Sequence, residues 1–81
     1  PTADEDIDFT RSFEERELYE DLARSVQALP ERERLVVSLY YVERLTMKDI
    51  AAVLQVSETR VSQLHAQAVK RLRRALLRDV A

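Results

Sequence analysis

Polar side chains that can hydrogen-bond to the edges of DNA bases occur close together between residues 58 and 63. At about 100° of rotation per residue, a helix over this segment carries its apolar stripe at Val61, Leu64, Ala68, Leu72 and Ala75. Thr59 and Gln63 point away from that stripe, and Arg60 and Ser62 flank them. Arginine can donate two hydrogen bonds to guanine, and glutamine can pair bidentately with adenine. We therefore predict base contacts from Arg60 and Gln63, and contacts to bases or phosphates from Thr59 and Ser62.

A second set of polar residues suits the sugar-phosphate backbone, whose contacts fix the position of a protein on the duplex without reading its sequence. We predict phosphate contacts from Lys48, Ser57, Gln67, Lys70 and Arg73. Two alternatives stay open. The basic run 70–78 also suits the negative end of a helix dipole, and Glu58 suits the positive end. Glu58 would repel phosphate unless it accepts a hydrogen bond from a cytosine amine.

These side chains need two helices held at a fixed corner, and the spacing of residues 46–76 predicts one. Counted from Met47 as position 1, the small residue Ala51 falls at position 5. Apolar residues fall at positions 4, 8, 10, 15 and 18, which are Ile50, Leu54, Val56, Val61 and Leu64. This spacing is typical of a helix-turn-helix, whose second helix can enter a major groove about 12 Å wide.

The turn of this motif lacks the glycine that commonly takes a left-handed conformation. Gln55 stands at that position, and a left-handed glutamine costs about 1–2 kcal/mol, which the apolar clamp has to offset. Thr46 and Ser57 are good N-caps for the helices on either side. Both helices are therefore predicted to begin one residue after a hydroxyl side chain.

Two more helices are expected before the motif. Ser12 and Glu15 fit a capping box that begins a helix over 12–28, with a stripe at Leu18, Leu22, Val26 and Leu29. Pro30 suits the first turn of the next helix, which is expected to end near 43–44. Its expected apolar face consists of Leu35, Val36, Leu39, Tyr40 and Val42. Residues 1–11 are acidic and aperiodic, which predicts a tail or the end of a linker, so that the domain covers 12–81.

We expect structural roles, and no catalytic ones, for three aromatic residues, Tyr40, Tyr41 and His65. Tyr40 and Tyr41 are adjacent, so we expect one to pack inside and the other to be available to a partner. His65 lies about 40–50° from the centre of the apolar stripe. We expect a hydrogen-bonded histidine at the edge of the core and assign it no catalytic or ligand role.

Composition excludes several classes of protein. The 81 residues contain no cysteine, no glycine and one histidine, so disulfides, thiolate metal sites and glycine-rich phosphate loops are absent. No nucleophile, base and orienting group form a set, and we expect no enzyme, metal or cofactor. No apolar run approaches the roughly 20 residues of a membrane span, and no signal-peptide pattern appears in these residues, so we expect a cytoplasmic protein. Good helix formers dominate. We predict an all-α, compact four-helix domain with a long C-terminal recognition helix.

Charge is divided unevenly along the chain. The net charge is −2, yet residues 1–35 carry 11 acidic and 5 basic side chains, whereas residues 36–81 carry 4 and 8. Phosphate responds to the local field more than to the total charge. The distribution therefore favours a nucleic-acid partner for the second half.

The stretch from Leu29 to Leu76, LPERERLVVSLYYVERLTMKDIAAVLQVSETRVSQLHAQAVKRLRRAL, resembles region 4 of bacterial RNA polymerase sigma factors. LPERER, LYY and RVSQLH are similar to the alternative sigma factors of flagellar and sporulation type. The resemblance implies that the recognition helix reads the promoter −35 element through its outer N-terminal part, which gives as base-contact candidates Glu58, Thr59, Arg60, Ser62 and Gln63. It also implies docking on the flap-tip helix of the polymerase β subunit. Some members of this group are held inactive by an anti-sigma protein that covers region 4.

Two other functions are compatible with the same residues. The helix-turn-helix also resembles the DNA-binding domain of dimeric regulators of the quorum-sensing and response-regulator type, which would prefer palindromic half-sites about one helical turn apart. A module that binds only protein would present its helices to a partner groove. Such a module would show no salt-sensitive DNA binding.

Overall fold

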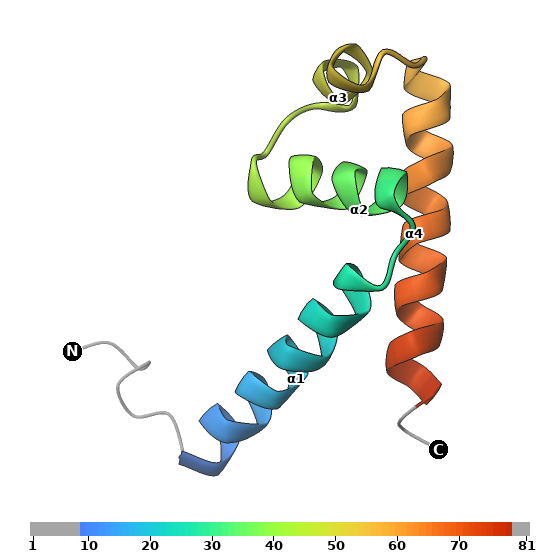
Figure 1. The fold of residues 1–81 in the computed structure, drawn as a ribbon. Helices are drawn as coiled ribbons and strands as arrows, with labels where there is room; N and C mark the ends of the chain where they lie inside the picture. Colours follow the sequence, from blue (N-terminus) through green and yellow to red (C-terminus); the bar gives the residue numbers. More distant parts are fainter. Residues whose placement is uncertain (1–8, 79–81) are drawn as a thin grey trace, which may run out of the picture.

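A computed structural model describes residues 9–78, and the side chains of residues 13–78. The chain folds into α1 (Phe9–Gln27), α2 (Glu31–Val37), α3 (Met47–Leu54) and α4 (Glu58–Arg78), with a π-helical turn, η2 (Ser38–Val42), directly after α2. The first three helices pack along one side of α4, as Figure 1 shows. The described residues contain no strand, and the all-α prediction is confirmed.

The start of α1 differs from the prediction. The helix is already formed at Phe9, so Ser12 lies inside it and the capping box expected there is wrong. No proline or glycine occurs between residues 9 and 12, and nothing in the backbone therefore ends the helix at Ser12. Residues 9–11 of the expected tail are helical, and residues 1–8 lie outside the described part. The expected stripe of α1 is also incomplete, because Leu18 is 59% exposed.

The segment after Pro30 begins as predicted and then departs from a regular α-helix. Pro30 is the N-cap of α2. In η2 the backbone N–H of Glu43 donates to the carbonyl of Ser38 at 3.1 Å, five residues back. A wider turn changes the direction in which the following side chains point. Val42 is therefore 73% exposed, and Leu35 is also exposed, although both were predicted to face the core; Val37 is buried instead.

The helix-turn-helix forms as the sequence predicts. The backbone N–H of Asp49 donates to Oγ1 of Thr46 at 3.1 Å, which caps α3. Gln55 is left-handed, with φ 58° and ψ 48°. The backbone N–H of Arg60 donates to Oγ of Ser57 at 3.0 Å at the start of α4. Each local signal at this corner is thus satisfied by the hydrogen bond or dihedral angle expected for it.

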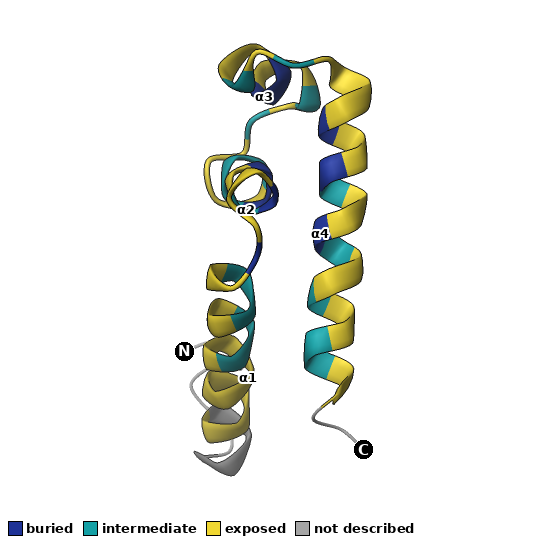
Figure 2. Cartoon of the chain, turned by 45° about the vertical axis from the view of Figure 1, so that its right-hand side comes forward, coloured by how far each residue is buried: buried dark blue, intermediate teal, exposed yellow. Residues whose placement is uncertain are grey.

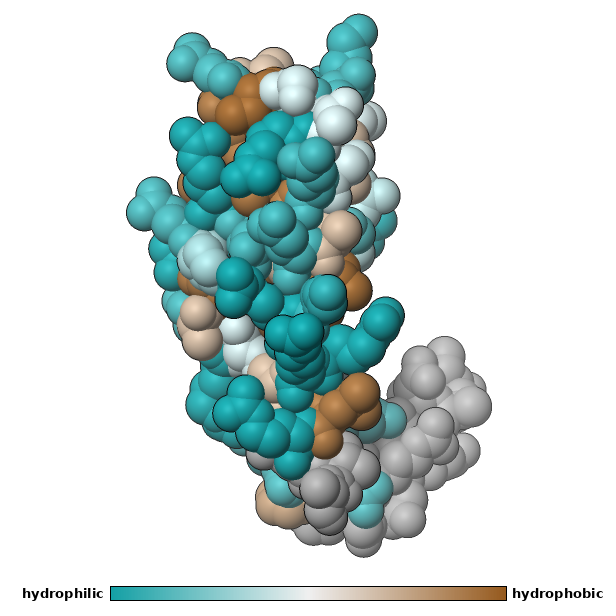
Figure 3. All heavy atoms as spheres, turned by 90° about the vertical axis from the view of Figure 1, so that its right-hand side faces the viewer, coloured by the Kyte–Doolittle hydropathy of each residue, from teal (hydrophilic) through white to brown (hydrophobic). Residues whose placement is uncertain are grey.

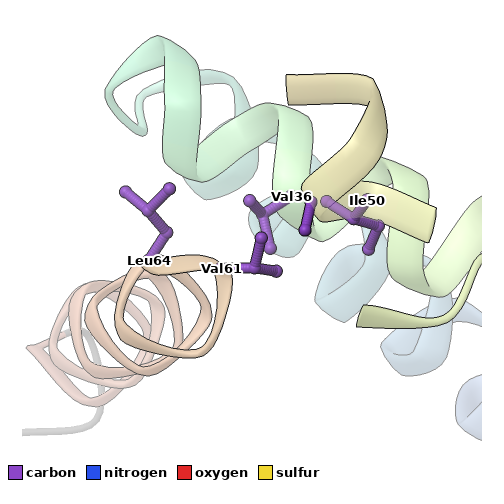
Figure 4. Packing of buried hydrophobic residues seen from close by; sticks show 5 residues of the cluster. Val36, Ile50, Val61 and Leu64 are labelled. Carbon is purple, nitrogen blue, oxygen red and sulfur yellow. The ribbon is translucent and has the colours of Figure 1, made fainter. Parts of the chain in front are cut away.

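The core lies where α2, α3 and α4 meet. Val36, Ile50 and Val61 are fully buried and Leu64 is 3% exposed; Figure 4 shows these four side chains converging from the three helices. A second cluster, farther along α4, joins Leu29, Val37 and Ala68. Figure 2 shows that the buried residues of α4 occupy the side that faces α2 and α3. The opposite side of α4 is left exposed.

Candidate nucleic-acid interface

All of the residues predicted to contact DNA are exposed to solvent. The five base-contact candidates lie in the first two turns of α4, which follow the helix-turn-helix corner. The outward face of α4 is largely hydrophilic in Figure 3. The structure therefore brings together Glu58, Thr59, Arg60, Ser62 and Gln63 on one end of a single helix.

Two of these residues contact each other. Nη1 of Arg60 donates to Oε1 of Gln63 at 3.4 Å. The distance is long for a hydrogen bond, and the pair is exposed, so a base edge with better geometry can replace it. The contact holds both side chains beside each other, one helical turn apart, in the absence of DNA.

The phosphate candidates spread more widely along the protein. Lys48 lies in the first turn of α3, and Ser57 already accepts the capping hydrogen bond of α4. Lys70 and Arg73 follow Gln63 by about 10 and 15 Å of helical rise. Gln67 is exposed and lies between Gln63 and Lys70. These positions can contact the backbone on either side of a groove that the first turns of α4 enter.

Glu58 lies in the first turn of α4, where a negative charge is favourable. This location agrees with the structural role considered for it. A base contact by Glu58 stays a prediction.

His65 and two tyrosines form an aromatic cluster. Oη of Tyr41 lies 2.6 Å from Nε2 of His65. The ring of Tyr41 stacks on His65 and the ring of Tyr40 meets it edge on. His65 is half-buried, as expected for a histidine at the edge of the core. Tyr40 packs against the core and Tyr41 is 55% exposed, so Tyr41 is the residue available to a partner.

A polar contact that the sequence analysis missed joins α2 to α4. Glu33 is 3% exposed, and Nε of Arg71 donates to its Oε2 at 3.2 Å and lies 3.0 Å from its Oε1. Oε1 accepts no hydrogen bond. The available signal was the helical phase of Glu33, which shares a face with Val36, Val37 and Tyr40.

Among the described residues, a hollow lies on each flank of α4. The first, which we call the apolar groove, has a volume of about 650 Å³ and lies between α1, η2 and α4. It is lined by Leu22, Val26, Val37, Ser38, Tyr41, Val42, Val69, Leu72, Arg73, Leu76 and Leu77. The second, which we call the arginine groove, has a volume of about 610 Å³. It lies between the end of α1 and the last two turns of α4.

Residues 26–74 match the family described as Sigma-70, region 4. The chain belongs to this family. The matched segment contains α3, the turn, most of α4 and every predicted site residue. Membership agrees with the resemblance found in the sequence and does not favour a dimeric regulator.

Relatives of this region 4 include flagellar sigma factors. The chain is 49% identical over 75 residues to RNA polymerase sigma factor FliA of Yersinia enterocolitica, which covers 93% of the chain and 33% of that protein. It is 60% identical over 55 residues to FliA of Pseudomonas aeruginosa, covering 68% and 22%. It is 45% identical over 60 residues to the RNA polymerase sigma-D factor of Bacillus subtilis, covering 74% and 24%. The chain thus spans about a third or less of the length of these relatives.

A solved structure shares the fold of this region 4. The chain superimposes with a TM-score of 0.76 and 41% identity on a sigma/anti-sigma complex, Sigma-28/FlgM, covering 94% of this chain and 31% of the other. Helices of residues 9–78 are too short or too polar to span a membrane.

Proposed function

We propose that this chain reads the −35 element of promoter DNA as part of an RNA polymerase sigma factor, in the cytoplasm, by binding and without catalysis. The observation that carries the proposal is the division of the first turns of α4 into two faces. Val61 and Leu64 are buried against α2 and α3, whereas Thr59, Arg60 and Gln63 project outward. A recognition helix requires this arrangement, because base readout needs side chains held at a fixed depth in the major groove.

The contacts divide into two classes. Arg60 and Gln63 read base edges, with Glu58, Thr59 and Ser62 beside them, because these side chains lie nearest the end of α4 that enters the groove. Lys48, Ser57, Gln67, Lys70 and Arg73 contact phosphates and position the domain. The two classes of contact are expected to differ in how their loss changes DNA binding. Base contacts change specificity, whereas phosphate contacts change affinity for every duplex and the salt dependence.

Base readout is tested with Arg60→Ala. A duplex is first selected by the chain from a randomised pool, and binding is then measured by fluorescence anisotropy. Loss of Arg60 is expected to weaken binding to the selected duplex by about 1–3 kcal/mol and to relax the preference at one base pair. The matched control, Lys70→Ala, should weaken all duplexes alike and lower the salt slope by about one unit. An equal loss on every duplex for Arg60→Ala would make Arg60 a phosphate contact.

The apolar groove supports docking on the polymerase. Tyr41, Val42 and Leu77 are each more than half exposed, and an amphipathic helix binds such a surface through its apolar face. We propose the flap-tip helix of the polymerase β subunit as the occupant. The related Sigma-28/FlgM structure contains an anti-sigma protein, and we propose that an anti-sigma protein competes for the same domain.

Docking is tested by pull-down of an isolated β-flap fragment with the full chain, with and without a competing anti-sigma protein. Val42→Asp places a charge in the groove and should abolish capture. Val53→Asp is the matched control, since Val53 is 59% exposed and lies outside the groove. If the Val42→Asp variant still captures the β-flap fragment, the flap binds to a different surface of the chain. Absence of capture by the wild-type chain, together with a preference for palindromic duplexes, would favour a dimeric regulator.

A further inference from the structure

Four arginines surround the arginine groove, at the end of α4 farthest from the helix-turn-helix. Arg24 comes from α1, and Arg71, Arg74 and Arg78 come from α4. The lining also includes the apolar residues Ala28, Leu29, Pro30 and Ala75. Positive and apolar side chains thus lie side by side at the end of α4 opposite to the predicted base contacts.

Much of this positive charge is uncompensated within the part of the chain that the structure describes. Arg24 pairs with Asp21 and Arg71 with Glu33. Arg74 and Arg78 have no ion-pair partner among residues 13–78. Arg71 contacts Glu33 through Nε, so both of its terminal nitrogens remain available. The buried carboxylate of Glu33 therefore holds one guanidinium in place at the groove while leaving its donors free.

The position of the groove separates it from the DNA-reading surface. Arg74 follows Gln63 by 11 residues, which is about 16 Å along α4. At about 100° per residue, Arg71 and Arg78 point roughly 80–100° away from the direction of Lys70, whereas Arg74 points only about 40° away from it. The distance along α4, more than the direction of the side chains, therefore separates this flank from the predicted base contacts.

We propose that the arginine groove binds an extended acidic segment of a partner protein. A hollow of about 610 Å³ that is lined by arginines and apolar residues accommodates a peptide strand, whereas a duplex presents a broad convex surface. The spacing also fits, because carboxylates on alternate residues of an extended chain lie about 6.6 Å apart and Arg74 and Arg78 are separated by about 6 Å of helical rise. Intervening apolar side chains can then contact Leu29 and Pro30. This proposal goes beyond promoter reading and does not depend on it.

The test uses the full chain and a fluorescein-labelled peptide of alternating Glu and Ala, with the matching Gln–Ala peptide as the uncharged control. Anisotropy is measured at about 0.1 M salt, where charges are screened beyond about 10 Å. The Glu–Ala peptide should bind and the Gln–Ala peptide should not. R74A/R78A should lower the affinity at least about fivefold, as expected from two lost ion pairs, and R74K/R78K should restore most of it.

The matched control is K70A/R73A, which removes two positive charges from the same helix outside the arginine groove. It should change peptide affinity less than about twofold while weakening duplex binding, whereas R74A/R78A should leave selected-duplex binding unchanged. An equal loss of affinity for the Glu–Ala peptide in both double variants would show that only net charge matters and would overturn the proposal. Displacement of the peptide by duplex DNA would identify a nucleic-acid site instead. A large gain in peptide affinity on deletion of residues 1–8 would identify the chain's own acidic segment as the occupant.

Discussion

The two halves of α4 are held to the protein by different means. The first half is fixed by fully buried Val61 and nearly buried Leu64, which pack against α2 and α3. The second half contributes half-buried Leu72 and Ala75, together with the polar contact between Arg71 and Glu33. The first half presents one convex polar face, and the second half is flanked by two grooves.

This difference corresponds to two kinds of recognition. Base readout tolerates little movement, because hydrogen bonds to base edges weaken steeply with distance and angle, and a closely packed core supplies the required rigidity. Protein docking gains from surface that is still exposed before binding. Close packing at one end of α4 and open grooves at the other are the arrangements that the two proposed uses of this helix require.

The largest expected effect separates the two halves by core truncation. Ile50→Ala removes a fully buried side chain from the first half's core and should lower the free energy of unfolding by about 2–5 kcal/mol. Leu72→Ala should cost roughly half as much, because Leu72 is half-buried. Urea unfolding followed by circular dichroism measures both. Ile50→Val, expected to cost about 0.5–1.5 kcal/mol, gives a readable value should the alanine variant not fold. Equal losses at Ile50 and Leu72 would contradict the distinction between the halves.

The next effect tests the polar contact of the second half. Arg71→Ala leaves the carboxylate of Glu33 buried without its partner, which destabilises the fold. Because Arg71 is 58% exposed, water screens part of the loss, and we expect about 1–3 kcal/mol by urea unfolding. The double variant E33M/R71M should recover stability, since an apolar pair of similar volume needs no compensation. A double variant less stable than Arg71→Ala would show that Glu33 acts through some other contact.

A smaller effect compares two serines with different positions in their helices. Ser57→Ala removes the cap of α4 and should cost about 1 kcal/mol. Ser12→Ala, inside α1, should leave stability unchanged or raise it slightly, because alanine is the better helix former. The two thermal unfolding midpoints are compared directly. An equal fall in the unfolding midpoint for Ser12→Ala and Ser57→Ala would show that Ser12 does cap a helix.

The smallest effect is expected for a glycine at the left-handed corner. Gln55→Gly relieves the side-chain clash at φ 58° but loosens the unfolded chain, so stability should rise by at most about 1 kcal/mol. Gln55→Val should instead lose about 1–2 kcal/mol, because a β-branched residue is poorly accommodated at positive φ. Arg44 has φ 60°, and Arg44→Gly is the matched variant at a turn outside the helix-turn-helix. A gain from Gln55→Val would show that the corner does not hold the glutamine in this conformation.

The parts of the fold that the sequence predicts well are those with local causes. Thr46, Gln55 and Ser57 act within a few residues of themselves, and the structure confirms all three. The exposed face of α4 follows from helical periodicity, so the candidate readers are placed correctly. Which of them contact bases stays a prediction, because periodicity gives direction and not partner.

The features that escaped prediction have causes distant in the chain. The Glu33–Arg71 contact joins residues 38 positions apart, and the two grooves depend on how α1 and η2 lie against α4. The π-helical turn has no local signal in SLYYV, and it moved Val42 out of the expected core. The prediction that a helix begins at Ser12 was wrong for a local reason. A good capping residue does not begin a helix when the residues before it are also helical.

Because α4 runs without interruption from Glu58 to Arg78, it is a rod about 31 Å long whose two ends keep a constant phase. A duplex bound at one end would therefore set the orientation, about the helix axis, of a partner that occupies a groove at the other end. Inserting one residue near the middle of α4 would rotate one end relative to the other by about 100° and lengthen the helix by about 1.5 Å. The side chains at each end would be unchanged, but the two binding surfaces would no longer have their present relative orientation.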